Sequence, residues 1–187
     1  TLGPGVRAML LYPMNALAND QVKRLREVLR DYPHITFGRY TGETQEDPKK
    51  GRELFAQLNP GVTPIPNELL SRAEMKKTPP HILLTNYAML EYLLVRPLDT
   101  PLFDGPTAAS WRWLAVDEAH VYGGSQGAEI AMLLRRLQQR VSPSSALQSI
   151  LTSATVGDDP SLVAEFATRL TRATVEWVPG EDLRCDV

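Results

Sequence analysis

Two adjacent carboxylates, Asp117 and Glu118, are the residues in this sequence whose type and spacing best suit chemistry. They follow a short apolar run at 113–116, and His120 stands two residues further on. The pattern predicts a buried strand that delivers both acids to its carboxyl end, where open α/β sheets bind ligands. One acid can then hold a magnesium ion while the other orients an attacking water, as in nucleotide hydrolysis.

An acid pair at the end of a strand can also be only a solvated turn or a helix N-terminus, because carboxylates are normally exposed. Two further apolar runs favour the functional interpretation. The stretch 149–154 runs into a Ser-Ala-Thr sequence at 153–155, and the stretch 8–12 ends in Pro13 before a helix. Three strands with polar residues at their carboxyl ends predict one shared site.

The alternation of apolar runs with helical periodicity predicts an α/β domain with a mostly parallel sheet. Strands are expected at 6–12, 35–40, 81–86, 113–116 and 149–154, with a last candidate at 173–178. Helices are expected from residue 14, at 50–58, 67–76, 87–95 and 128–141, and after Pro160. The Pro-rich stretch 47–80 is interpreted as a surface insertion, and Gly123, Gly124 and Gly127 as a flexible lead into the following helix.

Composition places the chain among ordinary globular domains, since 43% of its residues are hydrophobic and 22% are charged. The net charge of −2 gives no global attraction to nucleic acid, so any binding surface must be local. Cys185 is the only cysteine and has no partner for a disulfide within the chain. No apolar stretch is long enough to cross a bilayer. We therefore expect a cytoplasmic protein without a membrane partner.

Five short motifs resemble those of superfamily 2 DEAD/DEAH-box helicases, in the family's order and spacing. V-D-E-A-H at 116–120 resembles motif II, S-A-T at 153–155 resembles motif III, and Y-P-M-N-A-L-A-N-D-Q at 12–21 resembles motif Ia. Y-T-G-E-T at 40–44 resembles the Gly-containing motif, and L-T-N-Y at 84–87 stands in the place of the Thr-Pro motif. The resemblance implies the amino-terminal, three-layer RecA-like motor domain of a helicase.

Three further stretches are most similar to the DNA-repair helicase branch that includes the Lhr and MrfA proteins. They lie at 85–103, 122–129 and 133–137, and the whole resemblance covers about residues 6 to 178. The chain departs from the family at Met14 and Asn15, where a threonine and a basic residue are common. Contacts from backbone N–H groups at this helix start are therefore expected in preference to side-chain contacts.

The resemblance also implies roles for individual residues. Asp117 would ligate magnesium through water, and Glu118 would polarise the attacking water. His120 would couple hydrolysis to strand movement together with Gln126, Ser153, Ala154 and Thr155. Nucleic acid would be contacted by Pro13, Asn15, Gln21, Gly42, Thr85 and Asn86.

The chain contains no Gly-Lys dipeptide, so it lacks the P-loop pattern G-x-x-x-x-G-K-S/T that holds nucleotide phosphates. We expect a truncated first RecA-like domain at 1–178, spanning motifs Ia to III and lacking the P-loop strand. Residues 179–187 would begin a linker to a second motor domain. The 149–154 strand should then pair with 113–117 on one side, with its other side open or closed by 173–178.

These expectations together describe a fragment of an ATP-dependent superfamily 2 DNA helicase or translocase, inactive alone without its P-loop. ATP and Mg²⁺ are the expected cofactors, and DNA and the second RecA-like domain of the same parent chain are the expected partners. Two alternatives stay open, namely the translocase subunit of a restriction or phage-defence complex and a non-catalytic nucleic-acid-binding scaffold. The intact D-E-A-H favours an enzyme, whereas the missing P-loop favours a scaffold.

Overall fold

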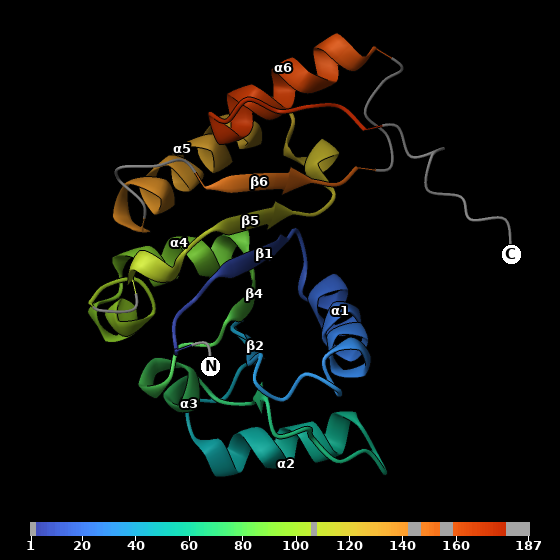
Figure 1. Ribbon diagram of the computed structural model, residues 1–187, viewed down its shortest axis with the longest axis vertical. Coiled ribbons are helices and arrows are strands. Elements are labelled where there is room, and N and C mark those ends of the chain that lie inside the picture. Colours follow the sequence, from blue (N-terminus) through green and yellow to red (C-terminus); the bar gives the residue numbers. More distant parts are fainter. Residues whose placement is uncertain (1–2, 106–107, 142–146, 154–158, 179–187) are drawn as a thin grey trace, which may run out of the picture.

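Six parallel strands form the centre of the molecule, in the order β3-β2-β4-β1-β5-β6 (Figure 1). The computed structural model describes residues 3–105, 108–141, 147–153 and 159–178. The strands are β1 (Ala8–Tyr12), β2 (Phe37–Arg39), β3 (Glu68–Leu69), β4 (Ile82–Asn86), β5 (Trp113–Val116) and β6 (Gln148–Leu151). The α-helices are α1 (Asn15–Val28), α2 (Pro48–Leu58), α3 (Arg72–Lys77), α4 (Tyr87–Val95), α5 (Gly124–Val141) and α6 (Pro160–Thr171). Three 3₁₀-helices, η1 (Pro97–Leu102), η2 (Ala108–Ser110) and η3 (Ala119–Tyr122), connect them.

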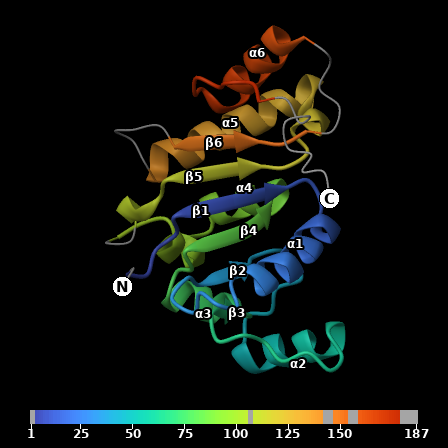
Figure 2. The ribbon, with the colours of Figure 1, turned by 45° about the vertical axis from the view of Figure 1, so that its right-hand side comes forward.

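Helices cover both faces of the sheet, with α1 on one face and α4 and α5 on the other (Figure 2). Successive strand residues point to opposite faces, so β1 contributes to two cores. Met9 and Leu11 join the core shared with α4 and α5, whereas Tyr12 joins the core beneath α1. The expected three-layer α/β architecture is confirmed, and the described sheet is entirely parallel.

Side-chain caps fix where several helices begin, as the short polar residues that precede them allow. Asp47 accepts from two backbone N–H groups of α2, Asn86 accepts from Met89 N at the start of α4, and Ser71 forms a capping box with Glu74 in α3. Helix α1 differs, because Met14 precedes it and no side chain caps its N–H groups. The start of α1 therefore keeps its backbone donors free of side-chain partners.

The expectation of one helix at 67–76 is wrong, because Glu68–Leu69 forms the edge strand β3 and a helix begins only at Arg72. The surface insertion is thus part of the sheet. Its polar residues are buried with partners, since Glu68 pairs with Arg26 and the Asn67 amide donates to three backbone carbonyls after α1. Apolar periodicity cannot detect a strand that is buried through ion pairing and amide hydrogen bonds.

The carboxyl-terminal part differs from expectation in two ways. Helix α5 begins at Gly124 rather than at Ala128, and 173–178 forms no strand. Strand β6 pairs with β5 in register from Trp113↔Gln148 to Val116↔Leu151, which confirms the expected neighbour. Among the described strands none pairs with the other side of β6, which leaves it as the edge of the sheet. No helix in the described ranges is long and apolar enough to cross a membrane.

Candidate nucleotide and nucleic-acid site

The parallel strands bring their polar ends to one edge of the sheet, on the right in Figure 1. Two groups of side chains lie there. The acidic cluster follows β5 and β6 and comprises Asp117, Glu118, His120, Thr152 and Ser153. The amide network lies at the carboxyl ends of β1, β2 and β4 and comprises Asn15, Asn19, Arg39, Glu43 and Asn86. Because β1 lies between β4 and β5 in the sheet, it separates the two groups.

Asp117 is anchored from both neighbouring strands. Its backbone N–H donates to the Leu11 carbonyl at 2.9 Å, and its Oδ1 accepts from the Thr152 hydroxyl. Burial raises the pKa of Tyr12 to about 12, with a further contribution from the Asp117 charge. The carboxylate is thus held in a fixed place at the end of β5. Sequence reasoning missed Thr152, although a hydroxyl residue at the end of the neighbouring strand was a usable signal.

Glu118 stands in the left-handed region of the backbone map, with φ 52° and ψ 46°. For a residue with a Cβ this conformation costs about 1–3 kcal/mol, and such strain concentrates at functional sites. Its Oε2 is buried and lies 3.2 Å from His120 Nδ1, whereas the side chain as a whole is 34% exposed. The strained turn therefore places a partly exposed carboxylate at the carboxyl edge of the sheet, with one oxygen turned towards His120.

His120 joins the ends of two strands. Its Nδ1 lies 3.1 Å from Ser153 Oγ, and the backbone N–H of Ala119 donates to the Thr152 carbonyl at 2.8 Å. The structure thus brings His120 and Ser153 together. Gln126 is exposed in the first turn of α5. The two remaining residues assigned to coupling, Ala154 and Thr155, lie outside the described residues.

Gly127 holds η3 against α5 by close backbone contact. A Cβ built at this position would lie 2.2 Å from the Tyr122 carbonyl oxygen, far inside any normal contact. The glycine is therefore a packing residue and not part of a flexible lead. It fixes the segment that carries His120.

We expect Gly127→Ala to destabilise the purified chain by about 1–3 kcal/mol, as overpacking does. The gain of about 1 kcal/mol from replacing a helical glycine by alanine cannot offset a clash with backbone. Urea unfolding measures the difference. Gly123→Ala is the matched control, because its Cβ would meet nothing closer than 3.9 Å. Equal unfolding midpoints for the two variants would show that the contact has no structural importance.

The amide network connects three strand ends through side chains. Asn86 Nδ2 donates to Asn15 Oδ1 at 2.6 Å, and Asn15 Nδ2 donates to Glu43 Oε1 at 3.2 Å. Arg39 Nη1 donates to Glu43 Oε2 at 2.9 Å and also to Asn19 Oδ1. Two of the residues expected to bind nucleic acid, Asn15 and Asn86, are therefore in contact. Arg39, Glu43 and Asn19 join them although the sequence motifs did not single them out for binding.

The other residues expected to bind nucleic acid are placed less directly. Thr85 is fully buried and its hydroxyl donates to the Tyr40 carbonyl at 2.7 Å, which argues against a direct contact with phosphate. Gly42 is exposed in the loop after β2, with open space where a Cβ would stand. Pro13 and Gln21 are half-buried at either end of the motif Ia segment.

A buried contact ties the loop after β2 to the segment after α4. The Tyr40 hydroxyl donates to the fully buried Asp99 of η1, and burial with this hydrogen bond raises the pKa of Tyr40. The Arg72 guanidinium lies 5.3 Å from the centre of the Tyr40 ring and donates to the Thr41 and Gly42 carbonyls. The loop that contains Gly42 is therefore held in place by Arg72 and by the Tyr40–Asp99 hydrogen bond. No sequence motif indicated these contacts.

The oxygen donors at Asp117 suit a magnesium ion. Mg²⁺ in phosphoryl-transfer sites is commonly held by one or two carboxylates, with substrate phosphates and waters completing the shell. Asp117 supplies such a carboxylate, with the Thr152 hydroxyl bonded beside it. Within the described ranges no group of three or more His, Cys, Asp or Glu side chains could hold a metal. Among the described residues, Asp117 is the acid that would hold the ion.

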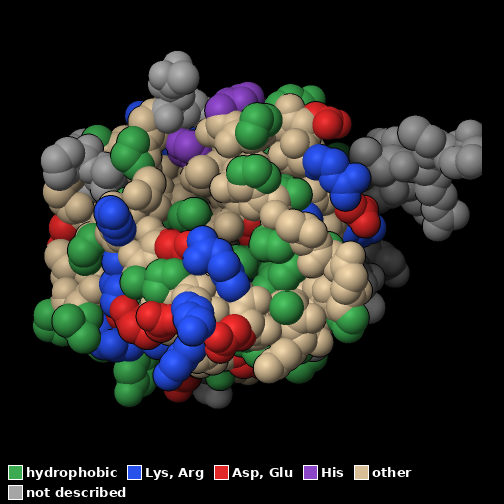
Figure 3. Space-filling view, turned by 90° about the horizontal axis from the view of Figure 1, so that it is seen from below, with side chains coloured by type: hydrophobic (Ala, Val, Ile, Leu, Met, Phe, Trp, Pro, Cys, Tyr) green, Lys and Arg blue, Asp and Glu red, His purple; other side chains and the backbone are tan. Residues whose placement is uncertain are grey.

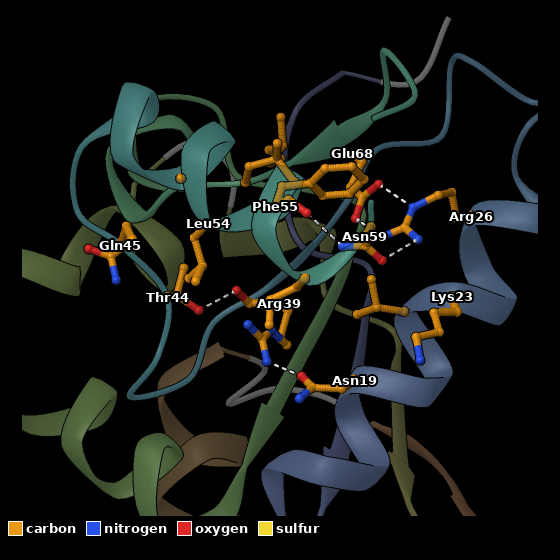
Figure 4. Close-up of a pocket in the computed structure, with 15 residues that line it drawn as sticks. Asn19, Lys23, Arg26, Arg39, Thr44, Gln45, Leu54, Phe55, Asn59 and Glu68 are labelled. Atoms are coloured by element: carbon orange, nitrogen blue, oxygen red, sulfur yellow. Dashed lines mark hydrogen bonds and ion pairs between the residues drawn. The ribbon is translucent and has the colours of Figure 1, made fainter. Parts of the chain in front are cut away.

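A cavity of about 180 Å³ lies apart from the acidic cluster, between α1, α2 and the β2–β3 edge (Figure 4). Arg26 crosses its wall and pairs with Glu68 through two hydrogen bonds of 2.8 and 2.9 Å. The guanidinium also lies 4.7 Å from the centre of the Phe55 ring. The two charged side chains are only 10% and 4% exposed, so this pair fixes α1 to the edge strand.

The parallel sheet with helices on both faces, and the acidic cluster at its carboxyl edge, define the class as a RecA-like helicase motor domain. The model of the family described as "DEAD/DEAH box helicase" matches residues 1–163, and the chain belongs to this family.

Individual relatives agree. Druantia protein DruE of Escherichia coli (strain UMEA 4076-1) is 32% identical over an alignment 259 residues long, which covers 90% of this chain and 14% of DruE. ATP-dependent helicase Lhr-Core of Methanothermobacter thermautotrophicus is 29% identical over 141 residues, covering 75% of this chain and 14% of that protein. The chain thus spans about one seventh of the length of either relative.

Solved helicases share the fold. The DUF1998 helicase MrfA bound to DNA and AMPPNP superposes with a TM-score of 0.62 at 27% identity, covering 89% of this chain and 19% of MrfA. The Mycobacterium smegmatis helicase Lhr bound to ssDNA and AMP-PNP gives 0.61 at 27% identity, covering 87% of this chain and 18% of Lhr. The expected relationship to the Lhr and MrfA branch is confirmed.

Proposed function

We propose that this chain is part of the first motor domain of an ATP-dependent helicase that moves along DNA. The proposal rests on one observation, namely that the acidic cluster and the amide network lie at the same edge of the sheet. The acidic cluster has the chemistry for hydrolysis, and the amide network has the chemistry for holding a backbone. A second RecA-like domain in the same parent protein and a cytoplasmic location belong to the proposal.

In this function Glu118 accepts a hydrogen bond from the attacking water and orients it, for which its side chain is partly exposed, at 34%. Asp117 holds the magnesium ion, which neutralises charge on the nucleotide phosphates when bound. His120 couples Glu118 to Ser153 through its Nδ1. This nitrogen lies 3.2 Å from Glu118 Oε2 and 3.1 Å from Ser153 Oγ. Gln126, Ala154 and Thr155 are assigned to the same coupling.

The nucleic acid is proposed to lie over the amide network. Helix α1 presents backbone N–H groups with no capping side chain and no acidic residue in its first turn, which favours a phosphate there. Backbone contacts suit a motor that must move over any sequence. The relatives MrfA and Lhr are described as bound to DNA and to ssDNA, which supports DNA as the partner.

The face of the molecule at the α2 end has no single sign of charge (Figure 3). On the face seen from the α2 end, acidic and basic side chains are interspersed and no broad basic field forms. Charged residues of α2 and α3 take part in ion pairs, since Arg52 pairs with Glu74 and Lys76 with Glu46. This face therefore offers no broad basic field to a nucleic acid.

The test is ATP hydrolysis by the full-length protein with and without single-stranded DNA of unrelated sequences. We expect stimulation by every sequence, because phosphate contacts carry no sequence information, and no activity from the 187-residue chain alone, which has no Gly-Lys motif. A strand-separation assay distinguishes a helicase from a translocase that hydrolyses ATP without unwinding. DNA binding by a full-length protein that never hydrolyses ATP would contradict the proposal and identify a scaffold.

A further inference from the structure

One carboxylate, that of Glu43, receives donors from two different elements of the amide network. Asn15 of α1 donates to Oε1 at 3.2 Å, and Arg39 of β2 donates to Oε2 at 2.9 Å. Each carboxylate oxygen thus takes one donor. A guanidinium and an amide have been arranged around a single anionic group that offers two oxygens.

A phosphodiester offers the same chemistry, namely one negative charge shared by two unesterified oxygens. Arginine is the side chain best matched to such a group, because its planar fork donates to two oxygens or from two nitrogens. We propose that Arg39 and Asn15 form a binding site for one backbone phosphate of the nucleic acid, and that Glu43 occupies this site when nucleic acid is absent. The proposal rests on the proposed function and adds to it a site and an internal competitor.

The donors are fixed while the carboxylate is free to leave. The Arg39 side chain is 14% exposed and is also held by Asn19, whereas Glu43 is 49% exposed. Asn86 donates to Asn15 Oδ1 and so turns the Asn15 amide nitrogen towards Glu43. Displacing Glu43 into water would therefore leave both donors in place.

The strength of the Glu43 contact is compatible with displacement. Ion pairs that water reaches are weak, and the Arg39–Glu43 pair is open to water on the side of Glu43, which is 49% exposed. The buried Arg26–Glu68 pair is the opposite case, since two hydrogen bonds and low exposure lock it. The Arg39–Glu43 pair can therefore exchange partners, whereas the Arg26–Glu68 pair is structural.

The location agrees with the proposed path of the strand. Arg39 ends β2, Asn86 ends β4 and Asn15 follows β1, and these three strands are neighbours in the sheet. Asn15, one of the two donors, is also the first residue of α1, and no side chain caps this helix start. A phosphate in this site would be shared between side-chain donors and the amino end of α1.

The experiment measures binding of a labelled single-stranded DNA of mixed sequence to the full-length protein. We expect Glu43→Gln to tighten binding about threefold to fivefold, which is the range that loss of a competing exposed ion pair allows. Arg39→Gln should weaken binding, and the slope of log affinity against log salt should fall by about 0.7, the value for one phosphate contact with a single strand. In the Arg39→Gln background, Glu43→Gln should no longer tighten binding.

Glu165→Gln is the matched control, because Glu165 also pairs with an arginine four residues away and its loss changes the net charge equally. It should leave affinity unchanged. Arg39→Lys keeps the charge without the fork and should recover the salt slope but only part of the affinity. Unfolding midpoints of each variant identify any that fail to fold.

Three results would overturn the proposal. They are an unchanged or weaker affinity in Glu43→Gln, an equal gain in Glu165→Gln, or a gain that persists in the Arg39→Gln background. Stimulated ATP hydrolysis by all variants with any of these results would leave the proposed function intact. A full-length protein that binds no DNA in any variant would refute both.

Discussion

Glu118→Gln is expected to lower DNA-stimulated ATP hydrolysis of the full-length protein by a factor of about 100 to 10,000, the range for removal of a general base. The amide keeps the size of the side chain but cannot accept a proton or hold water as a carboxylate does. Nucleotide binding should remain, because the proposed magnesium anchor is Asp117. Steady-state hydrolysis and binding of a fluorescent ATP analogue measure the two quantities.

The strained backbone at Glu118 makes a matched control necessary, because glutamine could alter the turn itself. Glu129→Gln changes an exposed acid of α5 and should leave hydrolysis unaffected. Equal unfolding midpoints for the two variants would assign the loss to chemistry. Full hydrolysis in Glu118→Gln would remove this residue from the proposed mechanism.

Glu68→Gln is expected to destabilise the purified chain by about 3–5 kcal/mol, because it leaves the Arg26 charge buried without compensation. Little of Arg26 reaches water, since its side chain is only 10% exposed and its guanidinium lies against the Phe55 ring. Urea unfolding monitored by circular dichroism gives the change. The fall should appear as a lower midpoint, with a slope close to that of the unmodified chain.

Two comparison variants separate burial from charge in this prediction. Glu165→Gln breaks the exposed pair with Arg169 and should cost less than about 1 kcal/mol. Replacing both buried partners, Arg26→Met with Glu68→Leu, should recover most of the loss, because a well-packed apolar pair is often as stable as a buried ion pair. A loss in Glu68→Gln no greater than that in Glu165→Gln would mean that Arg26 finds another partner.

Elements with a strong local signal could be predicted from the sequence. The strand at 113–116 and the helix at 87–95 have the expected bounds, because an apolar run ending in polar residues and a helix capped by Asn86 are both local features. The meeting of Asp117, His120 and Ser153 followed from parallel strands sharing one edge. The family resemblance added the assignment of that edge to ATP hydrolysis.

What the sequence could not predict depends on partners far along the chain. Thr85 stands in a motif position, yet its hydroxyl donates to Tyr40, a residue 45 positions earlier. Glu68 lies buried in an edge strand, where Arg26 of α1 pairs with its charge. The competition at Arg39 depends on side-chain geometry that no motif encodes. Sequence patterns identify residue types at strand ends, whereas hydrogen bonds between elements decide which of those residues remain available.

Strand β1 has a mechanical consequence because it is the single element between the two groups. The Leu11 carbonyl accepts the Asp117 N–H on one side, and Leu11 is in register with Thr85 on the other. Neighbouring strands lie about 5 Å apart, so force from the phosphate proposed at the start of α1 would reach Asp117 through this one strand. A displacement of the β1–α1 junction would act on Asp117 through its hydrogen bond to Leu11, with no hinge or loop between them.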